Sequence, residues 1–115
     1  MGQLTTHVLD TASGRPATGV EFVLHRLGST RELVSRGRTN ADGRADQPLL
    51  SGDSFIAGTY ELTFFVGAYF SSTGVPTSNA PFLDEVPLRF TLTADEHYHV
   101  PLLVSPWSYS TYRGS

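Results

Sequence analysis

Short segments in which an apolar side chain recurs at every second position dominate this chain. The pattern is clearest in residues 58–66, and it also occurs in residues 19–27 and 86–93. A period of two is typical of β-strands that bury one face, because successive side chains of a strand point to opposite faces. Turn-forming clusters such as Ser13-Gly14-Arg15-Pro16 and Asn40-Ala41-Asp42-Gly43 separate these segments. The sequence therefore favours an all-β fold.

Eight short strands are predicted, at intervals of about ten residues, which is typical of a β-sandwich or barrel. They are expected at residues 4–10, 19–27, 31–38, a short segment opening at Arg44, 58–66, 86–93, 97–104 and 107–113. Residues 67–72 are expected to form one or two helical turns, and residues 73–85 a loop. Pro101 cannot donate a backbone hydrogen bond, so it predicts irregular pairing in the seventh strand.

The length and charge of the chain narrow the possible partners. A chain of 115 residues corresponds to one domain, residues 1–115, that buries roughly two-thirds of its extended surface. Such a domain leaves little interior for a deep pocket. The net charge of −3 favours neither nucleic acid nor an anionic membrane as a partner. No apolar run reaches the length of about 18 residues needed to span a bilayer, and the start lacks the features of a signal peptide. We therefore expect a cytoplasmic protein.

The side chains that are missing exclude several kinds of chemistry. The sequence has no cysteine, which excludes disulfides, thiolate zinc sites and a cysteine nucleophile. All eight cationic side chains are arginines. Without lysine, Schiff-base catalysis and a Walker-type phosphate loop are also excluded.

Histidines are the candidates for acid–base work. In a strand, His97 and His99 point to the same face and could meet one ligand, although such a pair is more often solvated or hydrogen-bonded. A zinc site needs three or four ligands and the spacing offers no third, so no metal is predicted. His7 shares a face with Thr5 and Leu9. His25 lies among core-like residues and is expected to be structural.

The last predicted strand carries an unusual face. Ser108, Ser110 and Tyr112 line one side, with only small hydroxyls and a phenol. Such a face suits a polar ligand or a wet subunit interface. The alternative is that the chain simply ends on an edge strand.

Four motifs, in this order, resemble the transthyretin-like 5-hydroxyisourate hydrolase family. They are His7-Val8-Leu9-Asp10 with Gly14-Arg15-Pro16-Ala17; Asp42-Gly43-Arg44; His97-Tyr98-His99-Val100-Pro101-Leu102-Leu103 before Ser105-Pro106; and Tyr109-Ser110-Thr111-Tyr112-Arg113-Gly114-Ser115. The terminal Tyr-Arg-Gly-Ser separates the hydrolases of this family from transthyretin, the hormone carrier.

The resemblance implies a fold, an assembly and a reaction. The fold is an eight-stranded transthyretin-like β-sandwich with one short helix. The assembly is a homotetramer, a dimer of dimers, with active sites in a cleft between dimers. The reaction is the hydrolytic ring opening of 5-hydroxyisourate to 5-hydroxy-2-oxo-4-ureido-2,5-dihydro-1H-imidazole-5-carboxylate (OHCU), which makes the enzyme a cyclic amidohydrolase of urate breakdown. The resemblance implies no metal and no organic cofactor.

The resemblance also assigns roles to individual residues. The catalytic positions are His7, Arg44 and His99; substrate contacts fall to His7, Arg44, Tyr112 and Ser115; supporting positions are His97, Ser110 and Arg113.

Either histidine of the catalytic set could activate water. Histidine titrates near neutrality, so His99 could take and return a proton, with His7 holding the water or sharing that role. The sequence leaves this choice open. Arg44 suits a developing oxyanion.

Two other classes of function compete with the hydrolase. A transthyretin-like carrier of a small aromatic ligand would need an open channel, which the bulky polar side chains of His7, His99 and Tyr112 argue against. A purely structural β-sandwich module would be a monomer.

Overall fold

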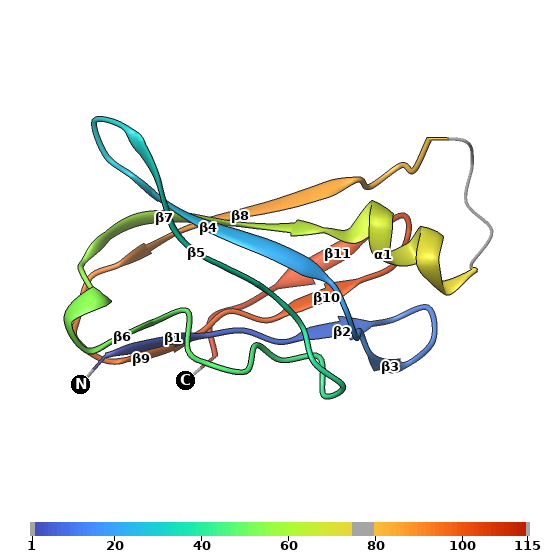
Figure 1. Ribbon diagram of the computed structural model, residues 1–115, viewed down its shortest axis with the longest axis horizontal. Coiled ribbons are helices and arrows are strands. Elements are labelled where there is room, and N and C mark those ends of the chain that lie inside the picture. The colour runs from blue at the N-terminus through green and yellow to red at the C-terminus, as the bar shows by residue number, and fades with distance from the viewer. Residues whose placement is uncertain (1, 75–79, 115) are drawn as a thin grey trace.

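The chain folds into two layers of strands that pack face to face (Figure 1). The computed structural model describes residues 2–74 and 80–114. The first layer is antiparallel, and its strands lie in the order β5-β4-β7-β8. These strands are β4 (Glu21–Leu27), β5 (Arg31–Arg38), β7 (Gly58–Phe65) and β8 (Glu85–Leu92).

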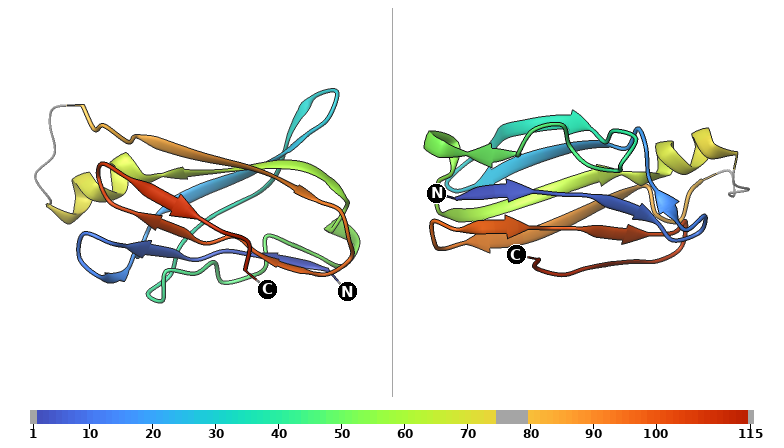
Figure 2. Two further views of the ribbon diagram at one scale, coloured as in Figure 1. Left: turned by 180° about the vertical axis from the view of Figure 1, so that it is seen from behind. Right: turned by 90° about the horizontal axis from the view of Figure 1, so that it is seen from below.

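The second layer consists of shorter strands in two hydrogen-bonded groups, ordered β6-β1-β9 and β11-β10-β2-β3. These strands are β1 (Gln3–Thr5), β2 (Val8–Asp10), β3 (Arg15–Pro16), β6 (Leu50–Ser51), β9 (His97–His99), β10 (Leu102–Val104) and β11 (Tyr109–Thr111). A 3₁₀ turn, η1 (Gly52–Ser54), follows β6, and the helix α1 (Val66–Thr73) continues directly from β7. Figure 2 shows this layer from the outside, with the C-terminal segment running along the β9–β10 strand.

The two groups of the second layer are one sheet interrupted in the middle. β1 pairs in parallel with β9, and β2 pairs in parallel with β10. Thr5 pairs with His99 and Val8 with Leu102, so the register is the same on both sides of the break. The break falls at Pro101, which confirms the irregular pairing predicted there.

Pro101 has no backbone N–H, and the hydrogen-bond donor that is missing there would have faced the last strand, β11. The backbone N–H groups of Val100 and Leu102, on either side of it, donate to the carbonyls of Thr5 and His7. The position of Pro101 therefore faces β11, where the hydroxyl of Thr111 donates to the Pro101 carbonyl at 2.7 Å. One side chain thus supports the edge strand where the backbone ladder lacks a donor.

The all-β sandwich with one short helix is confirmed, with differences at the ends of elements. The predicted strands 4–10 and 97–104 are each split in two, and 107–113 is shortened to β11. The short strand expected to open at Arg44 is a single bridge to His7, and the next strand is β6. The predicted helix 67–72 extends from Val66 to Thr73. Of the predicted loop 73–85, residues 75–79 lie outside the described residues.

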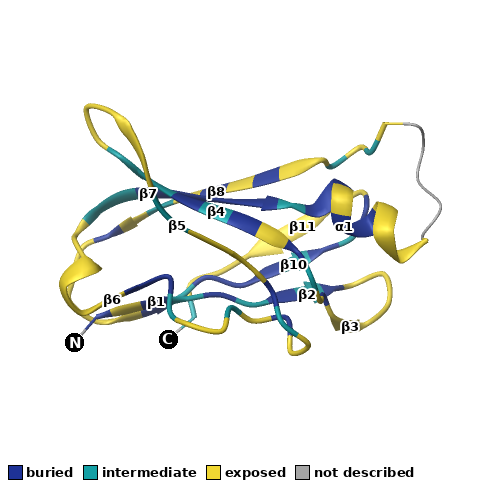
Figure 3. Ribbon diagram, in the orientation of Figure 1, coloured by how far each residue is buried: buried dark blue, intermediate teal, exposed yellow. Residues whose placement is uncertain are grey.

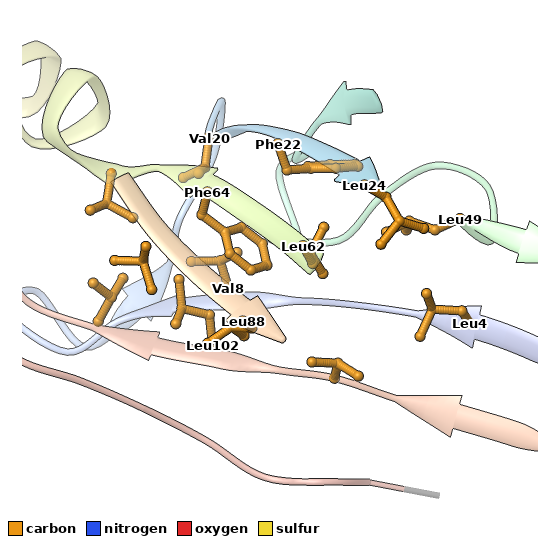
Figure 4. Packing of buried hydrophobic residues seen from close by; sticks show 14 of the residues in the cluster. Leu4, Val8, Val20, Phe22, Leu24, Leu49, Leu62, Phe64, Leu88 and Leu102 are labelled. Carbon is orange, nitrogen blue, oxygen red and sulfur yellow. The ribbon is translucent and has the colours of Figure 1, made fainter. Parts of the chain in front are cut away.

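The core lies between the layers, built from the side chains that the period of two predicts (Figure 4). Leu4, Val8 and Leu102 come from the second layer, while Leu62 and Phe64 come from the first, and all five are fully buried. Figure 3 shows buried positions along the strands of both layers, whereas the β4–β5 hairpin is exposed at its tip. The side chains on the outer face of each layer therefore take no part in this core.

The helix is tied to the second layer by a buried hydrogen bond. The Tyr69 hydroxyl donates to Asp10 Oδ2 at 2.9 Å, and Asp10 Oδ1 accepts from the backbone N–H groups of Ala12 and Ser13. Asp10 is only 2% exposed. Burial raises the pKa of Tyr69 to about 12, so the phenol stays protonated and donates at neutral pH.

Substituting Tyr69→Phe removes the donor and leaves Asp10 Oδ2 buried without a partner. We expect the free energy of unfolding to fall by about 1–3 kcal/mol, because a buried acceptor then lacks its hydrogen bond. Urea denaturation measures this loss. Thr30→Val, which removes an exposed hydroxyl just before β5, is the control and should unfold at the wild-type midpoint. Equal midpoints for both variants would contradict the role given to this bond.

Candidate active site

The candidate residues meet on the outer face of the second layer. Thr5 pairs with His99, and isolated bridges join His7 to Arg44 and His99 to Gly114. Directly paired residues of a sheet point to the same face, so the side chains of Arg44, His7, Thr5 and His99 share one face. The alternate residues Leu4, Thr6 and Val8 are buried in the core, which places the shared face outward.

Four side chains on this face form a continuous hydrogen-bonded chain. His7 Nδ1 lies 2.6 Å from His99 Nε2, and the two rings stack with centroids 4.8 Å apart. Thr5 Oγ1 lies 2.8 Å from His99 Nδ1 and 2.9 Å from His97 Nε2. The prediction that His97 and His99 share a face is confirmed, since both reach the same hydroxyl.

This hydrogen-bonded series of side chains leaves one ring nitrogen of the His7–His99 pair without a partner among the described residues. Both ring nitrogens of His99 are engaged, one by Thr5 and one by His7. Nε2 of His7 makes no hydrogen bond to any residue in the described ranges. A substrate or water molecule that approaches this pair therefore meets His7 Nε2 first.

Arg44 is placed beside His7 by a tight turn. Asn40 Oδ1 accepts hydrogen bonds from the backbone N–H groups of Asp42 and Arg44. Gly43 adopts a φ of +74°, and a Cβ there would lie 2.6 Å from the Val8 carbonyl oxygen. Only glycine fits this position, because the turn needs both a positive φ and a close approach to β2.

The charge of Arg44 is left uncompensated. Five of the eight arginines form ion pairs, namely Arg26, Arg31, Arg38, Arg89 and Arg113. Within the described part of the chain, Arg44 forms none. A free guanidinium next to two imidazoles is suited to hold a polar or anionic group on this face.

The end of the chain runs beside His99. The backbone of Gly114 exchanges two hydrogen bonds with His99, at 2.7 and 3.2 Å. Arg113 points elsewhere: its guanidinium lies over the Tyr98 ring, 4.3 Å from the centroid, and pairs with Glu96 at 2.6 Å. Arg113 therefore anchors the terminal segment, and its guanidinium reaches the backbone carbonyl of His97, at 3.5 Å, rather than a histidine ring.

The last strand brings its polar face to the same side of the sheet. Leu103 pairs with Ser110, and the bridge between His99 and Gly114 has the same register, which places Tyr112 opposite Pro101. Ser110 and Tyr112 therefore share the outer face with the histidines. Both are exposed, and neither contacts the histidine chain through a described hydrogen bond. Ser115 lies outside the described residues.

Comparison with known proteins identifies the family. A model of the HIUase/Transthyretin family matches residues 4–114. The chain belongs to this family. The resemblance seen in the sequence motifs is thereby confirmed.

Relatives within the HIUase/Transthyretin family are similar over nearly their whole length. 5-Hydroxyisourate hydrolase 2 of Rhizobium meliloti is 59% identical over 99% of this chain and 97% of its own. A 5-hydroxyisourate hydrolase of Deinococcus radiodurans is 57% identical over 97% of this chain and 95% of its own.

Two solved structures share the fold. The 5-hydroxyisourate hydrolase of Klebsiella pneumoniae superimposes with a TM-score of 0.81 at 37% identity, and each chain is fully covered. An (S)-allantoin synthase gives a TM-score of 0.94 at 55% identity over 99% of this chain. This chain spans only 44% of the synthase chain, so the likeness concerns one part of that larger protein.

Burial and nearby positive charge lower the pKa of both central histidines. For His7, burial is the larger cause and the charge of Arg44 the second. For His99, burial is again the largest cause, followed by the charges of His7, Arg44 and His97. Both imidazoles are therefore neutral near pH 7, which is the form that accepts a proton.

Thr5 belongs to the hydrogen-bonded series of side chains but was not among the predicted site residues. Thr5 contacts both His97 and His99, although the sequence singled it out only as a neighbour of His7 on one strand face. Its position two residues before His7 was the available signal. Its partners, however, lie more than 90 residues away, so only the strand register reveals the contact.

No metal site is apparent among residues 2–74 and 80–114: no group of three or more His, Cys, Asp or Glu side chains could hold an ion. The absence of a cofactor stays a prediction. His25 lies in β4 of the other layer, paired with Glu61, and so takes no part in this arrangement.

We expect His7 and His99 to titrate below pH 6.5, and Arg44→Gln to raise both pKa values because it removes a nearby positive charge. NMR titration of the ring protons measures these shifts. Arg36→Gln, in β5 of the opposite layer, is the matched control. Titration of both histidines at or above pH 6.5 would contradict the geometry.

The lowered pKa values of His7 and His99 also make the free energy of unfolding depend on pH. The folded state binds these two protons less tightly than the unfolded chain does. Their contribution to the free energy of unfolding is therefore present above pH 6.5 and is lost as the pH falls below it.

Proposed function

We propose that this chain hydrolyses 5-hydroxyisourate to OHCU, and that His7, His99 and Arg44 form the catalytic centre. The observation that carries the proposal is the stacked His7–His99 pair beside Arg44, which forms no ion pair within residues 2–74 and 80–114. Relatives that are 50–59% identical over nearly the whole chain and bear the name 5-hydroxyisourate hydrolase support it.

His7 is the residue that takes the proton from water. Its Nε2 makes no hydrogen bond to the described part of the chain, whereas both nitrogens of His99 are engaged. The water oxygen attacks the acyl carbon, and the C–N bond of the ring then breaks. The leaving nitrogen takes the proton from His7 Nε2 as it departs. His99 orients the His7 ring through the 2.6 Å contact and stabilises the imidazolium formed during the reaction.

Arg44 stabilises the charge that develops on the carbonyl oxygen. Its guanidinium is permanently charged and planar, which suits an oxyanion or a carbonyl edge of the substrate. Removing one such donor typically lowers the rate about 10² to 10³-fold. Tyr112 and Ser115, near the end of the chain, contact the substrate ring in this proposal, with Ser110 and His97 in support.

The working enzyme is a homotetramer whose active sites lie between dimers. The hollow beside Arg44 and Thr5 has a volume of about 130 Å³ and is not lined by His7 or His99, whereas ligand pockets usually measure roughly 300–1,000 Å³. In this proposal a second subunit covers the histidines and encloses the substrate.

The edges of the sandwich support this assembly. β8 and β11 are edge strands, and together they line a hollow of about 430 Å³. Three aromatic side chains stand exposed on or beside β11, namely Trp107, Tyr109 and Tyr112. Exposed aromatic groups at a sheet edge are typical of a subunit contact.

The compartment we propose is the cytoplasm. Within residues 2–74 and 80–114, no helix is long and apolar enough to cross a membrane.

His7→Ala, His99→Ala and Arg44→Ala should each lower kcat/KM for 5-hydroxyisourate, the histidine variants by about 10² to 10⁴-fold because a general base or its orienting partner is lost. The assay adds enzyme to 5-hydroxyisourate freshly made from urate and follows its decay above the spontaneous rate. Arg36→Ala, on the opposite layer, should retain wild-type activity.

Sedimentation of each variant as a tetramer is the control for assembly. Wild-type turnover in both His99→Ala and Arg44→Ala would refute the proposed centre. A wild-type protein that sediments as an active monomer would refute the shared site.

A peptide tag fused after Ser115 should lower activity at least about tenfold without changing the unfolding midpoint, since the backbone of Gly114 is paired with His99 beside the reacting groups. The same tag at the N-terminus is the control. Full activity in the C-terminal fusion would remove the chain end from the mechanism.

A further inference from the structure

The proposed reaction, on which this inference rests, produces an excess proton. Water supplies two protons, of which the leaving nitrogen takes one. The new carboxylic acid ionises at neutral pH because its pKa lies near 4. The second proton thus reaches the solvent from the new carboxyl group. The first, taken from water by His7 Nε2, places a positive charge on the His7–His99 pair until the leaving nitrogen receives a proton.

The hydrogen-bonded chain that begins at His7 leads to solvent. It passes from His7 to His99, from His99 to Thr5, and from Thr5 to His97. His7, His99 and Thr5 are half-buried, whereas His97 is exposed. The chain thus connects the shielded pair with an imidazole that exchanges protons freely with water.

The donor and acceptor roles along this hydrogen-bonded chain depend on which histidine the Thr5 hydroxyl donates to. A hydroxyl has one proton, so Oγ1 donates to only one of its two histidine partners and accepts from the other. If Thr5 donates to His99 Nδ1, then His99 Nε2 carries a proton and donates to His7 Nδ1, and His7 Nε2 is protonated. If Thr5 donates to His97 Nε2, His99 Nδ1 donates to Thr5, and His7 Nε2 is left with its lone pair.

We propose that Thr5 is a positioning residue that holds the second arrangement and passes the excess proton from the His7–His99 pair to His97. When His7 Nε2 takes a proton from water, His7 Nδ1–H transfers its proton to His99 Nε2. His99 Nδ1–H then transfers to Thr5 Oγ1, and the Thr5 proton moves to His97 Nε2. His97 releases a proton from Nδ1 to solvent. His7 is then neutral with its proton on Nε2, and the leaving nitrogen takes that proton as the C–N bond breaks. One proton then returns from solvent through His97, Thr5 and His99 to His7 Nδ1, which restores the second arrangement. Over one turnover each group gains and loses the same number of protons.

The groups around the chain favour movement of positive charge in this direction. Arg44, at the end of the turn that begins at Asn40, lies near His7 and His99, and its positive charge disfavours a proton on either ring. From the terminal segment, Gly114 presents only backbone to His99. Near His97, the Arg113 guanidinium is neutralised by Glu96 and lies 3.5 Å from the His97 carbonyl oxygen. A positive charge on the hydrogen-bonded chain is therefore less favourable at His7, beside Arg44, than at His97.

Thr5→Val tests the hydroxyl with almost no change of shape, and Thr5→Ser restores the hydroxyl alone. In Thr5→Val we expect kcat to fall about 10- to 100-fold, as is typical when a partner that fixes a histidine's tautomer is lost. The acidic limb of the kcat/KM profile should move to lower pH, because Thr5 no longer accepts the hydrogen bond that stabilises the protonated pair. Thr5→Ser should return both quantities to wild-type values.

¹⁵N NMR of the ring nitrogens, without substrate, reads the tautomers directly. In wild-type protein at pH 7.5, His7 and His99 should both carry the proton on Nδ1, and Thr5→Val should turn His99 into a mixture. A wild-type His99 protonated on Nε2, or a Thr5→Val variant with unchanged tautomer and pH profile, would overturn the proposal. This measurement needs no turnover, so it separates failure of the relay from failure of the proposed hydrolase activity.

Thr6→Val is the matched control. The neighbouring hydroxyl of Thr6 is buried and donates to the Val100 carbonyl at 2.7 Å, without touching a histidine. Thr6→Val should lower the unfolding midpoint and leave the tautomers and the pH profile unchanged. If Thr6→Val moved the tautomers as much as Thr5→Val does, the effect would be a general disturbance of the strand, and the proposal would fail.

Discussion

The parallel pairing of the first strand with the penultimate one is the interaction on which the rest of the structure depends. β1 and β2 lie beside β9 and β10 in one unbroken register. This pairing joins the two halves of the second layer and closes the sandwich over its core. It also brings Thr5 and His7 next to His97 and His99, which lie more than 90 residues further along the chain. Fold and candidate site therefore depend on the same strand pairing.

The same strand serves the core with one face and the site with the other. Leu4, Thr6 and Val8 point inward, while Thr5 and His7 point outward. A buried strand gives its outward side chains little freedom, because the alternate positions are held by packing on the opposite layer. The histidine chain gains its fixed geometry from this support, in keeping with the rule that functional groups are most precise on regular elements.

Periodicity predicted the strands and their buried faces well, because alternation is a local property that each segment carries by itself. Residues 58–66 and 86–93 illustrate this, since β7 and β8 fall within a residue or so of the prediction. Pro101 likewise announced the break in the second layer. The role of Thr5 and the free nitrogen of His7 could not be predicted, because both depend on the register between distant strands. Arg113 shows the same limit: the motif marked it, but only the fold reveals that it stacks on Tyr98 and pairs with Glu96.

The shared use of one strand has a consequence for how such a sequence can change over time. Substitutions on β1 and β2 act on one face at a time, so the core and the candidate site can vary separately. An insertion or deletion of one residue between Leu4 and Val8 is different, because a shift of one position exchanges the two faces. Such a change would bury imidazole and hydroxyl groups in the core and expose leucine and valine on the face of the candidate site. The length of this segment is therefore constrained by the core and by the candidate site together.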